Sequence, residues 1–489
     1  MRVQEFGPRL GYYPNAGKSW LVVKGEVEGL AKIVFDGTGI QITADGRRYL
    51  GSFIGSGEGK VQYVEEKIDE WCSQLKVLSK IGKSEPHAAY TAFVSGFRHR
   101  LTYYLRTIPN IEKHLKTLDE VIDKELIPAL TGGHLCTPDE RLLVSLPVRY
   151  GGLAIPIFSS IANFEHNNSK KVTKQLTSLI KLQDKSTAVD NNELRNAKKI
   201  VIKDREDRCS EILQELQSRM TKEQLRANAL SRMKGASSWL TSLPLASEHF
   251  RLNKREFFDA ICIRYRWQMS YMPSTCACGH PFSVDHALNC KIGGFIHQRH
   301  DDIRDFFAKL LSEVCKDVRV EPPLQPLTGE RLQDRANSSD DARLDVSARS
   351  FWQRGQIAFF DVRVFNPFAK CHLSQKLENA FTNNEREKKR AYNQRVIDIE
   401  HGSFNPLVFT PYGGSGREAE RFIRELSAKL SEKKDIPLSQ IVYWLRTKLS
   451  FHLTRSAVLC IRGSRAIKSN VTADLSEVQI TNVVGKIHK

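Results

Sequence analysis

Residues 356–365 read QIAFFDVRVF, an apolar run that contains one aspartate and one arginine. Successive side chains of a β-strand point to opposite faces, so the odd-numbered positions from Ile357 to Phe365 share one face and the even-numbered positions share the other. Asp361 and Arg363 are therefore presented together on a largely apolar strand. Burying a carboxylate in such a place costs free energy unless a neighbouring group compensates its charge.

Helices and further strands are predicted on both sides of this strand. Upstream lie a helix at 300–314 (HDDIRDFFAKLLSEV), a strand at 317–324 (DVRVEPPL) and a strand at 342–349 (ARLDVSAR). Downstream, a charged helix at about 376–398 and a strand at 405–414 (NPLVFTPYGG) are followed by amphipathic helices. The apolar periodicity thus predicts a domain with the order α-β-β-β-α-β.

A second aspartate, Asp345, stands sixteen positions before Asp361, which is the separation expected in a hairpin. Two carboxylates that converge across adjacent strands can hold Mg²⁺ or Mn²⁺, and such an ion can activate water and stabilise a phosphodiester transition state. Lys388, within EREKKRAY, can orient that water or neutralise developing charge. The structural alternative pairs Asp345 with Arg343 or Arg349 and leaves Lys388 in a solvated charge run. The three residues together, in this order of elements, favour a metal-dependent nuclease.

Residues 276–290 read CACGHPFSVDHALNC, and four of their side chains form a Cys/His cluster: Cys276, Cys278, His286 and Cys290. Three thiolates and one imidazole are a common tetrahedral zinc set, and a histidine and a cysteine four residues apart can share one face of a helical turn. All four positions are filled by protein, so the expected zinc ion is structural. The C-x-C spacing is shorter than the usual C-x-x-C, and cysteines without a metal are the alternative.

The charge balance favours a polyanionic partner. Lys and Arg outnumber Asp and Glu by 74 to 56, for a net charge of +18, and nucleic acid suits this surface better than a membrane does. A solvated basic surface without a ligand is the alternative. The sequence contains no apolar run long enough for a membrane span and no secretory signal, and its ten cysteines are expected to be reduced thiols in an intracellular compartment.

Composition divides the chain into six parts within an α+β multidomain fold. They are a β-rich segment (1–60), a helical domain (61–160), a charged helical connector (161–240), the Cys/His cluster region (241–292), the α-β-β-β-α-β domain (293–464) and a polar tail (465–489). Two interpretations of the connector are equally supported: a surface that lies along nucleic acid, or an ordinary solvated helical hairpin.

These motifs resemble the C-terminal part of non-LTR retrotransposon polyproteins of the restriction-like-endonuclease class, in which a CCHC zinc knuckle precedes a PD-(D/E)XK-type nuclease. The resemblance rests on the Cys/His cluster, RHDDIRD, ARLDV, FFDVRVF and EKKRAY. It implies that Asp345 and Asp361 are catalytic and bind Mg²⁺ or Mn²⁺, and that the catalytic lysine is Lys388, on a helix. The family's proline before the first aspartate is Leu344 here. The resemblance also implies a set of nucleic-acid-binding residues: Arg299, His300, Arg343, Arg363, Lys389, Arg390 and Tyr392. For Arg299 and His300 a structural role is the alternative.

The N-terminal part is similar to the reverse transcriptase of the same family. Residues 11–24 and 47–55 resemble the end of the palm and the primer-grip hairpin, and residues 126–133 and 141–156 resemble the thumb. No FADD or YADD segment occurs, so we expect no DNA synthesis by this chain alone and expect any palm to come from a separate chain, as in a truncated element copy. Residues 1–60 are then expected to expose an unpaired sheet edge and to be poorly ordered or prone to aggregation.

The resemblance implies a nuclear endonuclease that nicks double-stranded target DNA and binds element RNA, with time in the cytoplasm during ribonucleoprotein assembly. A different class of protein fits the same sequence: a zinc-stabilised DNA- or RNA-binding module whose nuclease fold has lost its activity. The two hypotheses differ in one respect. In the second, binding survives the loss of Asp361, and cleavage never occurs.

Overall fold

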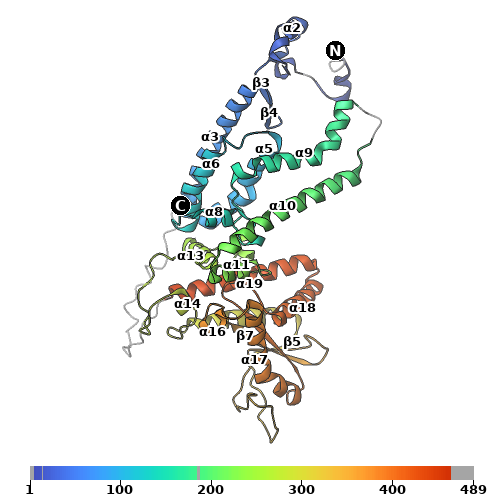
Figure 1. The fold of residues 1–489 in the computed structure, drawn as a ribbon. Helices are drawn as coiled ribbons and strands as arrows, with labels where there is room; N and C mark the ends of the chain where they lie inside the picture. Colours follow the sequence, from blue (N-terminus) through green and yellow to red (C-terminus); the bar gives the residue numbers. More distant parts are fainter. Residues whose placement is uncertain (1–4, 14, 184–187, 464–489) are drawn as a thin grey trace, which may run out of the picture.

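The computed structural model describes residues 5–13, 15–183 and 188–463, and the predicted polar tail at 465–489 lies outside them. The fold is α+β and mostly helical, with two two-stranded sheets and one four-stranded sheet in the part described. In Figure 1 the helical part lies above the four-stranded sheet and its helices. The α+β class predicted from the sequence is therefore confirmed.

In the β-rich segment predicted at 1–60, the described residues form four short strands and, between the first two, a helix that was not predicted. Strand β1 (Trp20–Val22) pairs in parallel with β2 (Gln41–Thr43), and β3 (Gly46–Tyr49) forms an antiparallel hairpin with β4 (Ser52–Gly55). Helix α2 (Glu28–Val34) connects β1 to β2. The parallel pairing explains this helix, because parallel strands need a crossover connection.

This N-terminal segment has almost no core of its own. Of its described residues up to position 55, only Gly7 is buried. Large apolar side chains such as Leu10, Ile33 and Leu50 are exposed, while the β3–β4 hairpin is held against α3 by the Phe53–Tyr63 ring stack. The poor order or aggregation expected of residues 1–60 stays a prediction.

The helical domain begins with α3 (Gly57–Gly82), whose N-terminus is capped by the Ser56 side chain. Its apolar stripe faces the core, since Val64, Ile68, Trp71 and Leu75 are buried. The other helices of this domain are α4 (Pro86–Ala92), α5 (Arg98–Thr107), α6 (Lys116–Val121), α7 (Ile127–Thr131) and α8 (Pro138–Ser145). Two π-helical turns, η4 (Phe93–Phe97) and η5 (Ile122–Leu126), join α4 to α5 and α6 to α7.

The predicted connector forms two long helices, α9 (Phe158–Leu182) and α10 (Asn191–Arg219), which extend side by side from the body (Figure 1). Glu165 is buried between them and is compensated by Arg205, whose Nη2 lies 2.7 Å from its Oε2, and by Arg106 at 3.0 Å. Three helices follow: α11 (Lys222–Arg232), α12 (Ser238–Thr241) and α13 (Lys254–Tyr265). Short 3-10 helices occur at η1 (Pro8–Leu10), η2 (Ala16–Lys18), η3 (Gly25–Val27) and η6 (Val148–Tyr150).

The C-terminal part has the predicted order of helix, three strands, helix and strand. Its elements are α14 (Val284–Ala287), α15 (Phe295–Val314), β5 (Lys316–Val320), β6 (Val346–Arg349), β7 (Ile357–Val364), α16 (Lys370–Leu373), α17 (Leu377–Asp398), β8 (Ser403–Phe409), α18 (Arg417–Lys434) and α19 (Leu438–Arg462). The strands form one sheet in the order β5-β6-β7-β8, antiparallel except for the parallel pair β7–β8. Helix α17 makes the crossover that this parallel pair requires.

The predicted alternation along β7 is confirmed. Ala358, Phe360 and Val362 pack in the core that the sheet shares with α15, α18 and α19. Phe359 and Phe365 belong to the apolar clusters on the opposite face, to which α17 contributes. Asp361 lies on this second face, so the sheet presents its buried carboxylate to α17.

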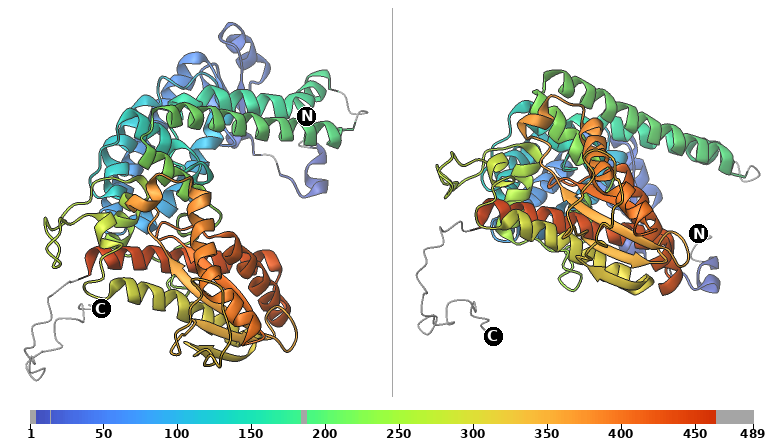
Figure 2. Two further views of the ribbon diagram at one scale, coloured as in Figure 1. Left: turned by 60° about the horizontal axis from the view of Figure 1, so that its bottom comes forward. Right: turned by 90° about the horizontal axis from the view of Figure 1, so that it is seen from below.

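Helix α19 belongs to two hydrophobic cores. Ile441 and Leu445, in its first half, pack under the sheet, whereas Val458 and Ile461, near its end, pack with the helical domain. Figure 2 shows α19, in red, passing from the sheet to the underside of the helical part. The helical domain, the Cys/His cluster and the sheet domain, which composition separates, therefore share one packed helix.

Burial also creates a pH-sensitive group in the core of the helical domain. His87 is 1% exposed, its ring stacks on Phe257 at 5.2 Å between centroids, and its Nδ1 accepts a hydrogen bond from the Leu252 amide. Desolvation by burial lowers the pKa of His87 to about 4 from its usual 6.5. A neutral imidazole is therefore the folded form.

We expect this histidine to make the protein less stable in mild acid. Because the folded pKa is depressed, the unfolded chain binds a proton first, and stability is lost as the pH falls from 6.5 towards 4. Going from pH 7.5 to pH 5 is expected to lower the free energy of unfolding by about 2 kcal/mol through His87 alone. Urea unfolding of the parent and of His87→Gln, which keeps an acceptor for the amide, measures this. The same pH slope in both proteins would contradict the prediction.

Candidate functional site

The two predicted catalytic aspartates lie opposite each other across adjacent strands. Val346 of β6 pairs with Phe360 of β7, which places Asp345, just before β6, beside Asp361. The Asp345 amide donates to the Phe360 carbonyl at 3.1 Å, and Asp345 Oδ2 accepts a 2.5 Å hydrogen bond from the Val362 amide. Main-chain pairing therefore holds both carboxylates at one point of the sheet.

Lys388 of α17 completes the predicted trio. Its Nζ lies 2.8 Å from Asp361 Oδ2, and it sits 5.8 Å from the centroid of the Tyr392 ring. The adjacent Lys389 points elsewhere and forms an ion pair with Glu418. Because α17 packs across the face that carries Asp361, the lysine reaches the carboxylate from the next element of the fold.

The structural alternative from the sequence does not match these contacts. In the described residues no ion pair joins Asp345 to Arg343 or Arg349, and Arg349 is paired with Asp317 at 2.7 Å. Lys388 is bound to a buried carboxylate and is not simply a member of a solvated run. The arrangement therefore concentrates charge where the sheet is otherwise apolar.

Burial and neighbouring charges shift the pKa values of Asp361 and His300. Burial raises the pKa of Asp361, which is only 5% exposed, and the charge of Asp345 raises it further, whereas Lys388 and His300 lower it; the net shift is upward. Burial lowers the pKa of His300, but its 3.0 Å contact with Asp345 and the nearby carboxylates of Asp301 and Asp361 together outweigh that effect, and the net shift is again upward. The local cations thus compensate the buried Asp361 carboxylate incompletely.

The donor chemistry fits a hard divalent cation. Mg²⁺ and Mn²⁺ prefer oxygen ligands, and Mg²⁺ is often bound through one or two protein carboxylates with water completing its shell. Asp345 and Asp361 supply two such carboxylates, and an added cation would relieve the incompletely compensated charge. Within the described chain, the only set of three or more ligands close enough to share an ion is the Cys/His cluster, so these two carboxylates would depend on water and substrate oxygens.

Arg299 has the structural role that was the alternative to nucleic-acid contact. Its side chain is 4% exposed, and its guanidinium donates to the carbonyls of Leu288 at 3.3 Å and Val364 at 3.1 Å. It joins the Cys/His cluster region to the end of β7, and burial removes it from the surface. Its neighbour His300 instead contacts Asp345 at the carboxylate pair.

Three other predicted nucleic-acid contacts belong to the segments that carry Asp345, Asp361 and Lys388. Arg343 and Arg390 are exposed. Arg363 is half-buried and forms an ion pair with Glu387 at 3.0 Å. Two of the three cations are therefore open to solvent, and the third is shared with an exposed carboxylate.

Tyr392 is half-buried and helps to hold the long loop between β5 and β6. Its hydroxyl accepts a hydrogen bond from Asn337 at 3.2 Å. The same loop is fixed by Arg395, which is fully buried and donates to the carbonyls of Asn337, Ser339 and Gln325. Sequence analysis missed Arg395, since nothing in a charged helix marks one arginine as buried.

The Cys/His cluster has the geometry of a tetrahedral metal site. The ligand atoms of Cys276, Cys278, His286 and Cys290 all lie within 4.8 Å of one another. Cys276 Sγ and Cys290 Sγ are 3.8 Å apart, and Cys278 Sγ is 3.2 Å from His286 Nε2. Two thiolates on one tetrahedral zinc ion, each at about 2.3 Å, are separated by about 3.8 Å, whereas a disulfide requires about 2 Å. The cluster can therefore hold a metal ion such as zinc, as the spacing predicted.

Short local hydrogen bonds position these ligands. Ser283 caps α14 by accepting from the His286 amide at 3.0 Å, and the Cys290 amide donates to the His286 carbonyl at 2.8 Å. Gly279, with φ of 83°, makes the turn after Cys278, where a left-handed backbone favours glycine. These contacts bring the two halves of the cluster together.

The cluster is also anchored to both neighbouring domains, which the sequence did not reveal. Asp285, next to the ligand His286, binds the guanidinium of Arg266 through both oxygens at 2.9 and 2.8 Å. The Tyr412 hydroxyl, from the sheet domain, donates to the same carboxylate at 3.3 Å. Arg266 follows α13, so one aspartate connects the cluster to the helical domain and to the sheet.

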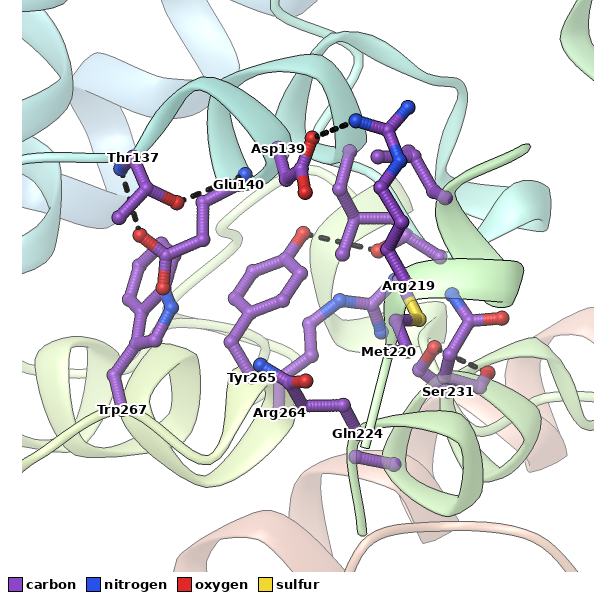
Figure 3. Close-up of a pocket in the computed structure, with 15 residues that line it drawn as sticks. Thr137, Asp139, Glu140, Arg219, Met220, Gln224, Ser231, Arg264, Tyr265 and Trp267 are labelled. Carbon is purple, nitrogen blue, oxygen red and sulfur yellow. Dashed lines mark hydrogen bonds and ion pairs between the residues drawn. The ribbon is translucent and has the colours of Figure 1, made fainter. Parts of the chain in front are cut away.

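A separate cavity of about 260 Å³ lies between α8, α11 and α13 (Figure 3). Arg264 crosses it and donates to the carbonyls of Val148 at 3.4 Å and Gly152 at 3.3 Å. Asp139, on the wall, is paired with Arg219 at 2.7 Å. These polar groups largely satisfy one another, and the cavity shares no residue with the carboxylate pair or with the Cys/His cluster.

Comparison with known proteins assigns no family. No protein-family model matches the sequence, and a search of curated proteins found no significant match. Among the described helices, none combines the length and the apolar character needed to span a membrane.

Proposed function

We propose that this chain is a metal-dependent endonuclease that binds nucleic acid and nicks double-stranded DNA. The observation that carries the proposal is the meeting of Asp345 and Asp361 across two strands, with Lys388 Nζ 2.8 Å from Asp361 Oδ2. Perturbed, partly buried titratable groups of this kind occur preferentially at functional sites. The net charge of +18 suits a phosphodiester substrate.

Asp345 and Asp361 would hold Mg²⁺ or Mn²⁺, which supplies a Lewis acid and an activated water for phosphodiester hydrolysis. The protein's own groups set the geometry. The Val362 amide and His300 fix the orientation of Asp345, and Lys388 lies where it can orient water or neutralise charge that develops on the phosphate. Arg343 and Arg390, both exposed, are available for backbone phosphates.

The resemblance to non-LTR retrotransposon proteins supports a finer form of the proposal. In it, the target is chromosomal DNA, the chain also binds element RNA in the nucleus, and a separate chain supplies any reverse transcriptase palm. The Cys/His cluster would hold a structural zinc ion. The contacts of Asp285 with Arg266 and Tyr412 would then hold the helical domain and the nuclease domain in a fixed relative position.

The second candidate is a zinc-stabilised nucleic-acid-binding protein without catalysis. One observation favours it: Lys388 forms an ion pair with the buried carboxylate of Asp361, and such a pair can serve a structural role alone. Leu344, in place of the family's proline, is buried beside Phe359 and keeps the strand packed without adding chemistry.

Nicking of supercoiled plasmid by the full chain separates the two candidates. We expect nicked circles with Mg²⁺ or Mn²⁺, none with EDTA, and at least about 100-fold less with Asp361→Asn. Asp340→Asn, an exposed aspartate of the same domain, is the matched control and should nick like the parent. Plasmid binding without nicking by all three proteins would establish the binding module and reject the nuclease.

A further inference from the structure

A basic groove crosses the helical domain, apart from the carboxylate pair. Two open cavities of about 1110 and 520 Å³ share the lining residues Gly132, Gly133, Lys254 and Phe258, and so form one continuous depression between α3, α7 and α13. We call it the lysine groove. Its lysines are Lys76, Lys80, Lys83, Lys124 and Lys254.

The charge of the lysine groove is largely uncompensated. All five lysines are exposed, and only Lys124 has an ion-pair partner among the described residues, Glu120 at 3.0 Å. Two acidic residues line the groove. One is Glu125. The other, Asp259, is buried and paired with Arg462, whose guanidinium donates to both carboxylate oxygens at 2.7 Å. The groove therefore presents a row of free cations, which suits a chain of phosphates.

An aromatic side chain stands at the edge of the same depression. Tyr271 is 86% exposed, although large aromatic side chains usually find cover, and Arg255 lies 5.6 Å from its ring centroid. Its φ of 57° is an uncommon conformation for a bulky residue. Arg462 holds this backbone by donating to the carbonyls of Ser270 and Tyr271, each at 3.1 Å.

Strained backbone that the surrounding structure enforces is concentrated at functional and ligand-binding sites. Here the Asp259–Arg462 pair enforces it, and the result is an aromatic face presented to solvent beside free cations. A cationic track with an exposed aromatic face is the arrangement that binds unpaired nucleotides, because the ring stacks on a base while the lysines contact the backbone. A duplex hides its base faces and would use the lysines alone.

We propose that the lysine groove binds single-stranded nucleic acid, with phosphates along Lys76, Lys80 and Lys83 and a base stacked on Tyr271. The inference rests on the proposed function in one respect only, that the chain acts on nucleic acid. It adds a second contact, away from the carboxylate pair, for an unpaired strand. RNA and DNA share this chemistry, and the comparison of the two identifies the natural ligand.

Fluorescence anisotropy of the full chain with labelled 20-nucleotide RNA, DNA and duplex of one sequence tests this. The triple change Lys76→Glu, Lys80→Glu and Lys83→Glu is expected to weaken single-strand binding by about 100-fold at 0.1 M salt and to reduce the salt slope by about 2. Tyr271→Ala is expected to weaken it about tenfold and to leave duplex binding unchanged.

Matched controls carry the same changes elsewhere. Lys198→Glu, Lys199→Glu and Lys203→Glu place the same charge on the exposed surface of α10, and Tyr443→Ala removes another exposed tyrosine. Both are expected to bind single strands within about threefold of the parent. An equal loss in the α10 triple, or an equal loss of duplex and single-strand binding in Tyr271→Ala, would overturn the proposal.

The two proposals fail separately. Asp361→Asn should retain single-strand binding even though it lacks nicking, because Asp361 lies outside the lysine groove. Absence of nicking in the parent, with single-strand binding intact, would reject only the nuclease. Nicking by a protein whose single-strand affinity is unaffected by the groove triple would reject only the groove.

Discussion

Replacing Lys388 with alanine is expected to reduce plasmid nicking by about 100- to 1000-fold, the usual cost of removing one group that stabilises transition-state charge. Lys388 Nζ lies 2.8 Å from Asp361 Oδ2, so it stands beside the carboxylate that would hold the metal ion. Lys389→Ala is a close control. It removes the same side chain one residue later, where the lysine is paired with Glu418, and should nick within about threefold of the parent.

A second readout separates catalysis from folding. Removing Lys388 leaves the Asp361 carboxylate buried without its cation, which is expected to destabilise the protein by on the order of 3 kcal/mol. The double variant Lys388→Ala with Asp361→Asn removes the uncompensated charge and should recover most of this stability. Full nicking by Lys388→Ala would remove the lysine from the proposed mechanism. Equal losses in the Lys388 and Lys389 variants would instead point to a general effect of charge on DNA binding.

Loss of the metal at the Cys/His cluster is also expected to destabilise the protein. The purified chain should contain one equivalent of zinc by mass spectrometry, and Cys290→Ser should lose it. The cluster region contributes Ala287 and Leu288 to the core of the helical domain, so its unfolding would expose packed surface. A loss on the order of 3 kcal/mol would lower the unfolding temperature by about 3 °C for a chain of this size that unfolds as one unit.

Cys371→Ser is the matched control, because this cysteine is exposed and lies outside the cluster. It should keep its zinc and its unfolding temperature. Chelation of the parent should reproduce the Cys290→Ser result, and added zinc should reverse it. A parent protein that contains no zinc, and whose unfolding temperature is unaffected by chelators, would show that these cysteines only pack.

Much of the sheet domain was predictable because its pattern is local. Alternation along 356–365 depends on the pleat of one strand, and the order of the flanking helices and strands follows from periodicities within single segments. The Cys/His spacing is likewise local, since four ligands within fifteen residues can meet through one turn and one short helix. The placement of Asp345 beside Asp361 follows from a hairpin, the shortest way to pair two strands.

Other features depended on contacts between distant segments. Arg299, expected at a nucleic-acid surface, is buried because the Cys/His cluster folds back onto the end of β7. The 2.8 Å contact between Lys388 and Asp361 depends on how α17 packs on the sheet, and helical periodicity does not specify that packing. Helix α2 connects two parallel strands. A short apolar run in the sequence does not show whether a strand will pair in parallel or antiparallel, so the helix was not predicted.

The sequence by itself determined the residue types, the strand faces and the ligand spacing, because each depends on the geometry of a single element. The tertiary structure decided which charges are buried together and which stay free. Arg395 and the five lysines of the lysine groove belong to similar charged helices or their flanking residues, yet one is fully buried and the others line an open depression. The physical reason is that burial and charge compensation depend on what packs against a side chain, and that neighbour comes from elsewhere in the chain.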